Sequence, residues 1–202
     1  IILGNHDGNL RNSSRQDALT PIAKALNHSD LHLLKDSGEV NLISGWVGQP
    51  KFCLNVLSVF DRDAWTKPTD LDAINIALYH GAISNSKTDT GWSMEHGEDD
   101  VSIFSDFDYG FLGDIHKTNQ PLDKKGKIRY VGSTVQQNHG ETNDKGFLLW
   151  DIKSKEEFSC EHHILENPKP FLTIKLTPKG RLPNKMKVKS GARLRLVSEN
   201  NL

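Results

Sequence analysis

The chain has 202 residues, of which 36% are hydrophobic, and a formal net charge of −1 at pH 7. This length suits one well-formed core and part of a second domain, and the absence of any apolar run of about 18 residues excludes a membrane-spanning helix. Of the two cysteines, Cys53 lies in an apolar run and is predicted to be a buried free thiol, which favours a reducing, cytoplasmic setting over a disulfide scaffold.

The near-zero net charge hides an asymmetry along the chain. Residues 168–202 contain nine Lys or Arg and one acidic residue, whereas residues 1–167 contain 16 basic and 25 acidic residues. A basic segment of this kind is typical of a protein that binds a polyanion such as DNA. On charge alone, an ordinary solvated surface is an equally good interpretation.

The hydrophobic pattern predicts both strands and helices along the chain. The apolar stripe of Ala18, Ile22 and Leu26 predicts a helix over Ser14–Leu26, capped by Ser13 or Ser14. Strands are predicted at residues 1–3, 31–35, 40–46, 52–59, 73–79, 109–112, 128–131, 146–152, 171–176 and 192–197, with 128–131 and 146–152 paired in a second sheet. Residues 101–107 are predicted to form a short helix, and the polar stretch 81–100 a long loop that lines the substrate groove.

Three of the predicted strands end in polar residues. Asn5, His6 and Asp7 follow the first strand after a glycine that permits a tight turn, and His80 follows the strand 73–79. Asp114 and His116 follow the strand 109–112. Polar sites in open sheets form outside the carboxyl ends of strands. Taken singly, His80 or His116 is more often an ordinary structural histidine, but the joint pattern favours a metal site. Its mixed oxygen and imidazole donors suit manganese, zinc or iron better than calcium.

The three motifs, Gly4-Asn5-His6-Asp7, His80 and Gly113-Asp114-Ile115-His116, resemble those of the calcineurin-like binuclear metallophosphoesterases. Within that family, the chain is most similar to the SbcD-like DNA nuclease subunits of bacteria and phages. The supporting segments are residues 58–61, 78–81, 112–117, 130–138, 146–151 and 170–174. The family's opening motifs would precede residue 1, so the resemblance implies an N-terminally truncated chain. Asp114 stands where most members have histidine, which favours a harder ion such as manganese.

The resemblance implies a partial four-layer α/β/β/α sandwich over residues 1–167, followed at residues 168–202 by the start of a small α+β DNA-capping domain. It implies two divalent metal ions, with manganese preferred. Asn5, His80 and Asp114 would bind one ion and His116 the other, whereas His6 would stabilise charge or protonate the leaving oxygen. DNA contacts are expected from the basic residues of the second domain, Lys175, Lys179, Arg181, Lys185 and Lys187.

The function that the resemblance implies is metal-dependent hydrolysis of DNA, as an exonuclease or endonuclease in repair or recombination. It would act as a homodimer with an SMC-like ATPase subunit of the SbcC type, and away from membranes. These 202 residues alone are expected to be inactive, because the upstream ligands are missing. Two alternatives stay open, namely a phosphatase or phosphodiesterase for small substrates and a non-catalytic DNA-binding scaffold.

Overall fold

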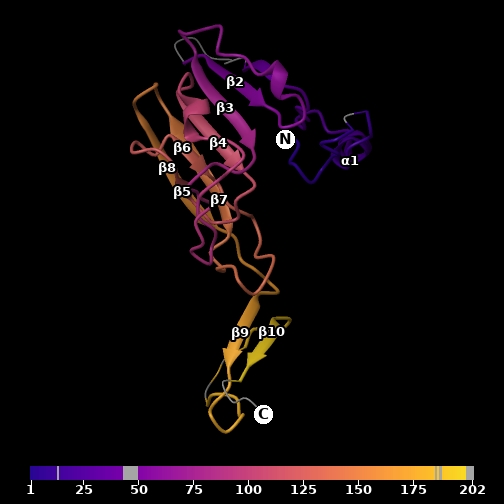
Figure 1. The fold of residues 1–202 in the computed structure, drawn as a ribbon, viewed down its shortest axis with the longest axis vertical. Helices are drawn as coiled ribbons and strands as arrows, with labels where there is room; N and C mark the ends of the chain where they lie inside the picture. Colours follow the sequence, from indigo (N-terminus) through magenta and orange to yellow (C-terminus); the bar gives the residue numbers. More distant parts are fainter. Residues whose placement is uncertain (13, 43–49, 185, 187, 199–202) are drawn as a thin grey trace.

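The computed structural model describes residues 1–12, 14–42, 50–184, 186 and 188–198. Its largest element is a six-stranded sheet in the order β1-β2-β3-β4-β6-β5 (Figure 1). The strands are β1 (Gly38–Leu42), β2 (Phe52–Leu57), β3 (Ile74–His80), β4 (Tyr109–Gly113), β5 (Gln120–Pro121) and β6 (Ile128–Tyr130). Strands β2, β3, β4 and β6 are parallel, and β1 and β5 pair antiparallel at the two edges. The carboxyl ends of the central strands therefore meet at one edge.

A hairpin of β7 (Gly146–Ile152) and β8 (Phe158–Ile164) covers one face of this sheet. Alternation along β7 turns Trp150 toward the sheet, where its ring lies 4.8 Å from that of Phe111. Phe158 packs edge-on against Tyr109 at 5.4 Å between ring centroids. Offset and edge-to-face aromatic pairs of this kind stabilise a core beyond the area that they bury.

The opposite face is covered by loops rather than by α-helices. The connection from β2 to β3 carries the 3-10 helix η1 (Arg62–Ala64), and that from β3 to β4 carries η2 (Val101–Phe104). Apolar side chains of these connections, Trp65, Met94, Ile103 and Phe107, pack against the buried cluster that contains Leu57, Tyr79, Leu112 and Tyr130. Successive parallel strands therefore stack through non-helical connections, which is a solenoid-like arrangement.

The prediction of an α/β four-layer sandwich is wrong. The fold is predominantly β, with 31% strand and 8% helix. Parallel strands are usually joined by helices, but the connections here lack the 3.6-residue apolar period of an amphipathic helix. Isolated aromatic and aliphatic anchors pack onto the sheet instead.

The one α-helix among the described residues is α1 (Leu19–Leu26), which begins later than predicted. Asp17 lies just before the N-cap residue Ala18. Its carboxylate accepts hydrogen bonds from the backbone N–H of Thr20 at 2.6 Å and from the Thr20 hydroxyl at 2.7 Å, which satisfies one free N–H of the first turn. Ser14 lies in a turn, and Ser13 lies outside the described residues. The helix buries none of its residues, and Figure 1 shows it beside the sheet rather than on a face of it.

The predicted pairing of residues 128–131 with residues 146–152 is also wrong. Strand β6 joins β4 in the first sheet, and β7 pairs with β8, which was not predicted. The ranges 1–3 and 31–35 meet in an isolated parallel bridge between Ile2 and Leu34. The predicted strand 40–46 is observed up to Leu42, and its remaining residues lie outside the described part of the chain.

Beyond residue 168, β9 (Phe171–Lys175) and β10 (Arg193–Val197) form a parallel pair. Figure 1 shows this pair projecting from the end of the molecule opposite β2. The domain boundary between residues 167 and 168 stays a prediction. Across the described residues, no helix combines the length and apolar character needed to traverse a bilayer.

Candidate metal and polar site at the sheet edge

Strand register places the first part of the site. Strands β3 and β4 are parallel, and His80 at the end of β3 is opposite Gly113 at the end of β4. Asp114 therefore leaves the sheet beside His80. Asn5 reaches the same edge from a turn that is closed by two hydrogen bonds, from the Asp7 N–H to the Gly4 carbonyl at 2.9 Å and from the Gly4 N–H to the Asp7 carboxylate at 2.7 Å.

Three of the predicted metal ligands converge at this edge. Asn5 Nδ2 donates a hydrogen bond to Asp114 Oδ1 at 3.3 Å. His80 Nε2 lies 3.8 Å from the same oxygen. Side chains separated by more than 100 residues along the chain, Asn5 and Asp114, are thus in direct contact, with the imidazole of His80 beside them.

Two glycines make room for the His80 ring. A Cβ at Gly4 would lie 2.7 Å from His80 Nε2, and a Cβ at Gly113 would lie 2.7 Å from His80 Nδ1. Neither residue tolerates a side chain without moving the imidazole. The glycine in each motif is therefore explained by close approach to the ring.

Two further observations fit a bound cation at this edge. Asn5 Oδ1 is buried and has no hydrogen-bond partner among the described residues, although buried polar atoms are nearly always paired. Asp114 has a φ of 96°, which a residue with a side chain adopts at a cost and which is typical of functional sites. An amide oxygen, a carboxylate and an imidazole are a donor set that manganese, iron or zinc accepts.

The electrostatics of His80 also suit a ligand. Burial lowers the pKa of His80, an effect that the neighbouring Asp114 and Asp7 carboxylates oppose and that His6 and His116 reinforce. The lowered pKa favours the neutral imidazole, whose free lone pair can bind a cation.

His6 and His116 lie around this cluster rather than within it. His6 is exposed, and its electrostatic effect contributes to lowering the pKa of His80. His116 Nδ1 lies 2.9 Å from Glu141 Oε1. No three side chains of His, Cys, Asp or Glu within the described ranges form a group able to hold a metal ion. Asn5, His80 and Asp114 are therefore a partial ligand set.

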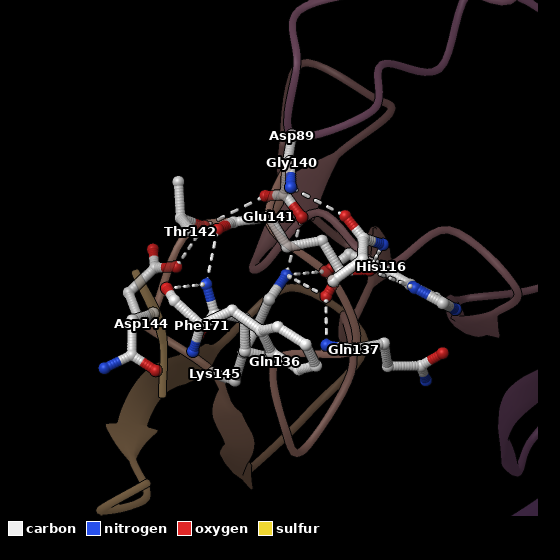
Figure 2. A network of polar contacts seen from close by, with 12 residues as sticks. Asp89, His116, Gln136, Gln137, Gly140, Glu141, Thr142, Asp144, Lys145 and Phe171 are labelled. Atoms are coloured by element: carbon white, nitrogen blue, oxygen red, sulfur yellow. Dashed lines mark hydrogen bonds and ion pairs between the residues drawn. The ribbon is translucent and has the colours of Figure 1, made fainter. Parts of the chain in front are cut away.

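Beside His116 lies a buried charge network that the sequence did not reveal (Figure 2). Lys145, 2% exposed, donates hydrogen bonds to Asp89 Oδ2 and to the His116 carbonyl, both at 2.6 Å. Its Nζ lies 3.9 Å from the Glu141 carboxylate. These residues come from polar loops without any periodicity. The sole signal was the expectation that loop 81–100, which contains Asp89, lines a groove.

Two cavities flank the edge. One of about 640 Å³ is lined by Asn5, Asp7, Arg11 and Arg15 among others. The other, of about 280 Å³, is lined by Asp114, His116 and Glu141 among others. Asn5 thus lines the first cavity and Asp114 the second, so the partial ligand set borders both.

The predicted DNA-binding residues lie away from this edge, in and after β9. Lys175, at the end of β9, is exposed, as are Lys179 and Arg181 in the following loop. Lys185 and Lys187 lie outside the described residues.

No family model matches the chain. The chain is 33% identical over 205 residues to the "Uncharacterized protein R555" of Acanthamoeba polyphaga mimivirus. The match covers 99% of this chain but 15% of that protein, so this chain spans a small part of its relative.

The assignment to the calcineurin-like metallophosphoesterases, and to their SbcD-like nucleases, is therefore wrong. The fold is mostly strand with one α-helix among the described residues, unlike an α/β sandwich, and the matched viral relative has no assigned function. Short motifs at strand ends indicated a family that the surrounding layers do not support. The part of that prediction that the structure supports is the proximity of Asn5, His80 and Asp114 at the sheet edge.

Proposed function

We propose that this chain contributes to a divalent-metal centre that hydrolyses phosphodiester bonds of DNA, as an exonuclease or endonuclease in repair or recombination. The observation that carries the proposal is the convergence of Asn5 and His80 on Asp114 Oδ1. It is joined by the buried oxygen of the Asn5 amide, which lacks a hydrogen-bond partner among the described residues. The oxygen-rich donor set favours manganese. The rest of the ligand shell, and the second ion, would come from residues outside this partial set.

The proposal gives roles to the three residues of the cluster and to the two histidines around it. Asn5, His80 and Asp114 hold one cation, and His116 contributes to a second. A bound divalent ion would neutralise phosphate charge and supply a nucleophile at neutral pH. His6, exposed beside the cluster, would stabilise charge on the phosphate or protonate the leaving oxygen.

DNA is favoured as the substrate by basic residues on two surfaces. The larger cavity beside Asn5 is lined by Arg11 and Arg15, whose guanidinium groups have no ion pair among the described residues. Lys179 and Arg181 expose further positive charge after β9. Exposed cations of this kind can contact a phosphate backbone. The ATPase partner and the homodimer stay predictions.

We further place the protein in the cytoplasm. Cys53 is a buried free thiol, and Cys160 is also unpaired. Reducing compartments keep cysteines in this state.

The test is manganese-dependent cleavage of linear duplex DNA by the natural full-length protein. His80→Ala is expected to weaken manganese binding at least about tenfold, because a ligand is lost. His6→Ala is expected to keep the metal and to slow cleavage by about 10²- to 10⁴-fold. His163→Ala, which removes an imidazole on β8, is the matched control. Normal metal content in His80→Ala would contradict the ligand assignment.

A non-catalytic DNA-binding segment is the second candidate, and the partial ligand set favours it. A scaffold of this kind would bind duplex DNA in a salt-dependent manner without cleaving it at any manganese concentration. Cleavage of a small phosphodiester but not of DNA would instead indicate a hydrolase for small substrates.

A further inference from the structure

Glu141 contacts the ring of His116 in the network shown in Figure 2. Its Oε1 lies 2.9 Å from His116 Nδ1. The glutamate side chain is 7% exposed, whereas that of His116 is 41% exposed. The imidazole therefore has one anchored nitrogen and a partly open ring.

Within the described part of the chain, the other contacts of the Glu141 carboxylate also come from donors. Asn138 Nδ2 donates to Oε1 at 2.8 Å, and the Gln137 N–H donates to Oε2 at 2.8 Å. Lys145 Nζ adds a positive charge 3.9 Å from Oε2. With a donor on each of its oxygens and a cation nearby, the Glu141 carboxylate acts as a hydrogen-bond acceptor at this site.

The contact with His116 therefore defines which ring nitrogen carries the proton. Because Glu141 accepts, Nδ1 of His116 must donate, and in the neutral ring Nε2 is left with a free lone pair. His116 and Asp114 line the same cavity of about 280 Å³. A carboxylate that orients an imidazole from behind in this way is the common arrangement behind histidine ligands of metals.

The loop that carries Glu141 is itself fixed at both ends. Gln136, 4% exposed, donates to the Glu141 carbonyl at 2.8 Å and to the Phe171 carbonyl at 3.1 Å, and accepts from the Phe171 N–H at 2.9 Å. On the other side, the Thr142 hydroxyl donates to Asp89 Oδ1 at 3.0 Å. The carboxylate thus has little freedom to leave His116.

We propose that Glu141 is a positioning residue that holds His116 in the Nδ1–H tautomer and presents Nε2 to a cation or to a substrate proton. The inference deepens the proposed function, because the identity of the group that Nε2 binds rests on that function. The tautomer and the orientation of the His116 ring do not rest on it.

The experiment uses the protein with ¹⁵N-labelled histidines, at mildly alkaline pH and without metal or DNA. Long-range ¹H–¹⁵N spectra distinguish the two neutral tautomers of each ring. In the wild type, His116 is expected to be the Nδ1–H form. An Nε2–H form would overturn the inference, and this measurement requires no substitution.

Glu141→Gln tests the cause. The new NH₂ group must face either Gln137 N–H or His116 Nδ1–H, so a donor meets a donor on one side. His116 is expected to lose its uniform Nδ1–H state, and the manganese concentration that broadens its signals should rise by about 10- to 100-fold. An unchanged tautomer and an unchanged manganese midpoint would overturn the role of Glu141.

Glu161→Gln is the matched control, because the Glu161 carboxylate also lies beside an imidazole, 3.7 Å from His163 Nε2, but is 70% exposed. It is expected to leave His116 unaltered. Absence of DNA cleavage together with an Nδ1–H wild-type tautomer would reject the proposed function while keeping the positioning role.

Discussion

The sheet edge and the loop network beside it bring distant residues together by different means. At the edge, backbone register aligns His80 with Gly113, and glycine at two positions lets the chain approach the ring. In the network, buried charges tie together loops that share no strand, as Lys145 does with Asp89. Backbone pairing is set by many hydrogen bonds, whereas the network depends on a few ionic contacts. Substitutions in the network should therefore mainly lower the free energy of unfolding, whereas substitutions at the sheet edge should mainly disturb the site.

The largest effect is expected in the network, for Lys145→Met. Loss of the ammonium leaves Asp89 and Glu141 buried without their cation, and removal of one partner from a buried pair costs about 3–5 kcal/mol of the free energy of unfolding. Urea denaturation measures this loss. Lys153→Met is the control, because Lys153 is exposed and its pair with Glu157, at 3.3 Å, should contribute less than about 1 kcal/mol. Equal losses in the two variants would show that the network does not hold the loops.

A smaller effect, focused on the site, is expected at the sheet edge for Gly113→Ala. The added methyl group would meet His80 Nδ1 at 2.7 Å, and overpacking of this kind costs about 1–3 kcal/mol. The ring must move, so the NMR signals of His80 should shift and manganese binding should weaken.

Gly110→Ala, on the same strand, is the control that separates the loss of stability from the displacement of the His80 ring. Its methyl group would meet the Ile128 side chain at 3.1 Å, so stability should change while the His80 signals stay as in the wild type. His80 shifts of the same size in both variants would mean that Gly113 has no special relation to the ring.

The contrast between edge and network also explains what the sequence predicts. The apolar runs that became β2, β3 and β4 are strong strand signals, and parallel strands place their carboxyl ends together. That reasoning leads directly to His80 and Asp114 at one edge. The close contact of Asn5 with Asp114 follows from a glycine turn, which is also visible in the sequence.

The burial of Lys145, the layers of the fold and the position of β8 depend on long-range packing, which local sequence patterns do not indicate. Lys145 is one of many lysines, and nothing around it marks it as buried. The layers of the fold were predicted from a resemblance rather than from periodicity, and the loops that replace the helices pack through single side chains such as Trp65. Strand β8 alternates Phe158, Cys160 and His162 with polar residues, a weak signal that its histidines obscured.

The smallest effect tests whether a buried carboxylate also anchors the N-terminal loops. The hydrogen bond from Lys35, at 2.7 Å, holds the pKa of the Asp17 carboxyl well below its usual range, against the opposing effect of burial. Because the folded pKa is lowered, this contribution is complete above the unfolded pKa of about 4 and is lost progressively as the pH falls from there toward the lower folded pKa.

Lys35→Met should therefore cost about 1 kcal/mol of unfolding free energy at neutral pH, since Lys35 is partly exposed. The difference from the wild type should shrink as the solution is acidified, and denaturation over a pH series measures it. Lys67→Met, which removes a more exposed pair with Asp106 at 3.0 Å, is the control and should show neither the loss nor the pH dependence. A loss for Lys35→Met that persists in acid would mean that Lys35 acts by packing its stem rather than through its charge. Of the two ion pairs compared, Lys35–Asp17 and Lys145–Asp89, the second alone would then hold its loops through charge.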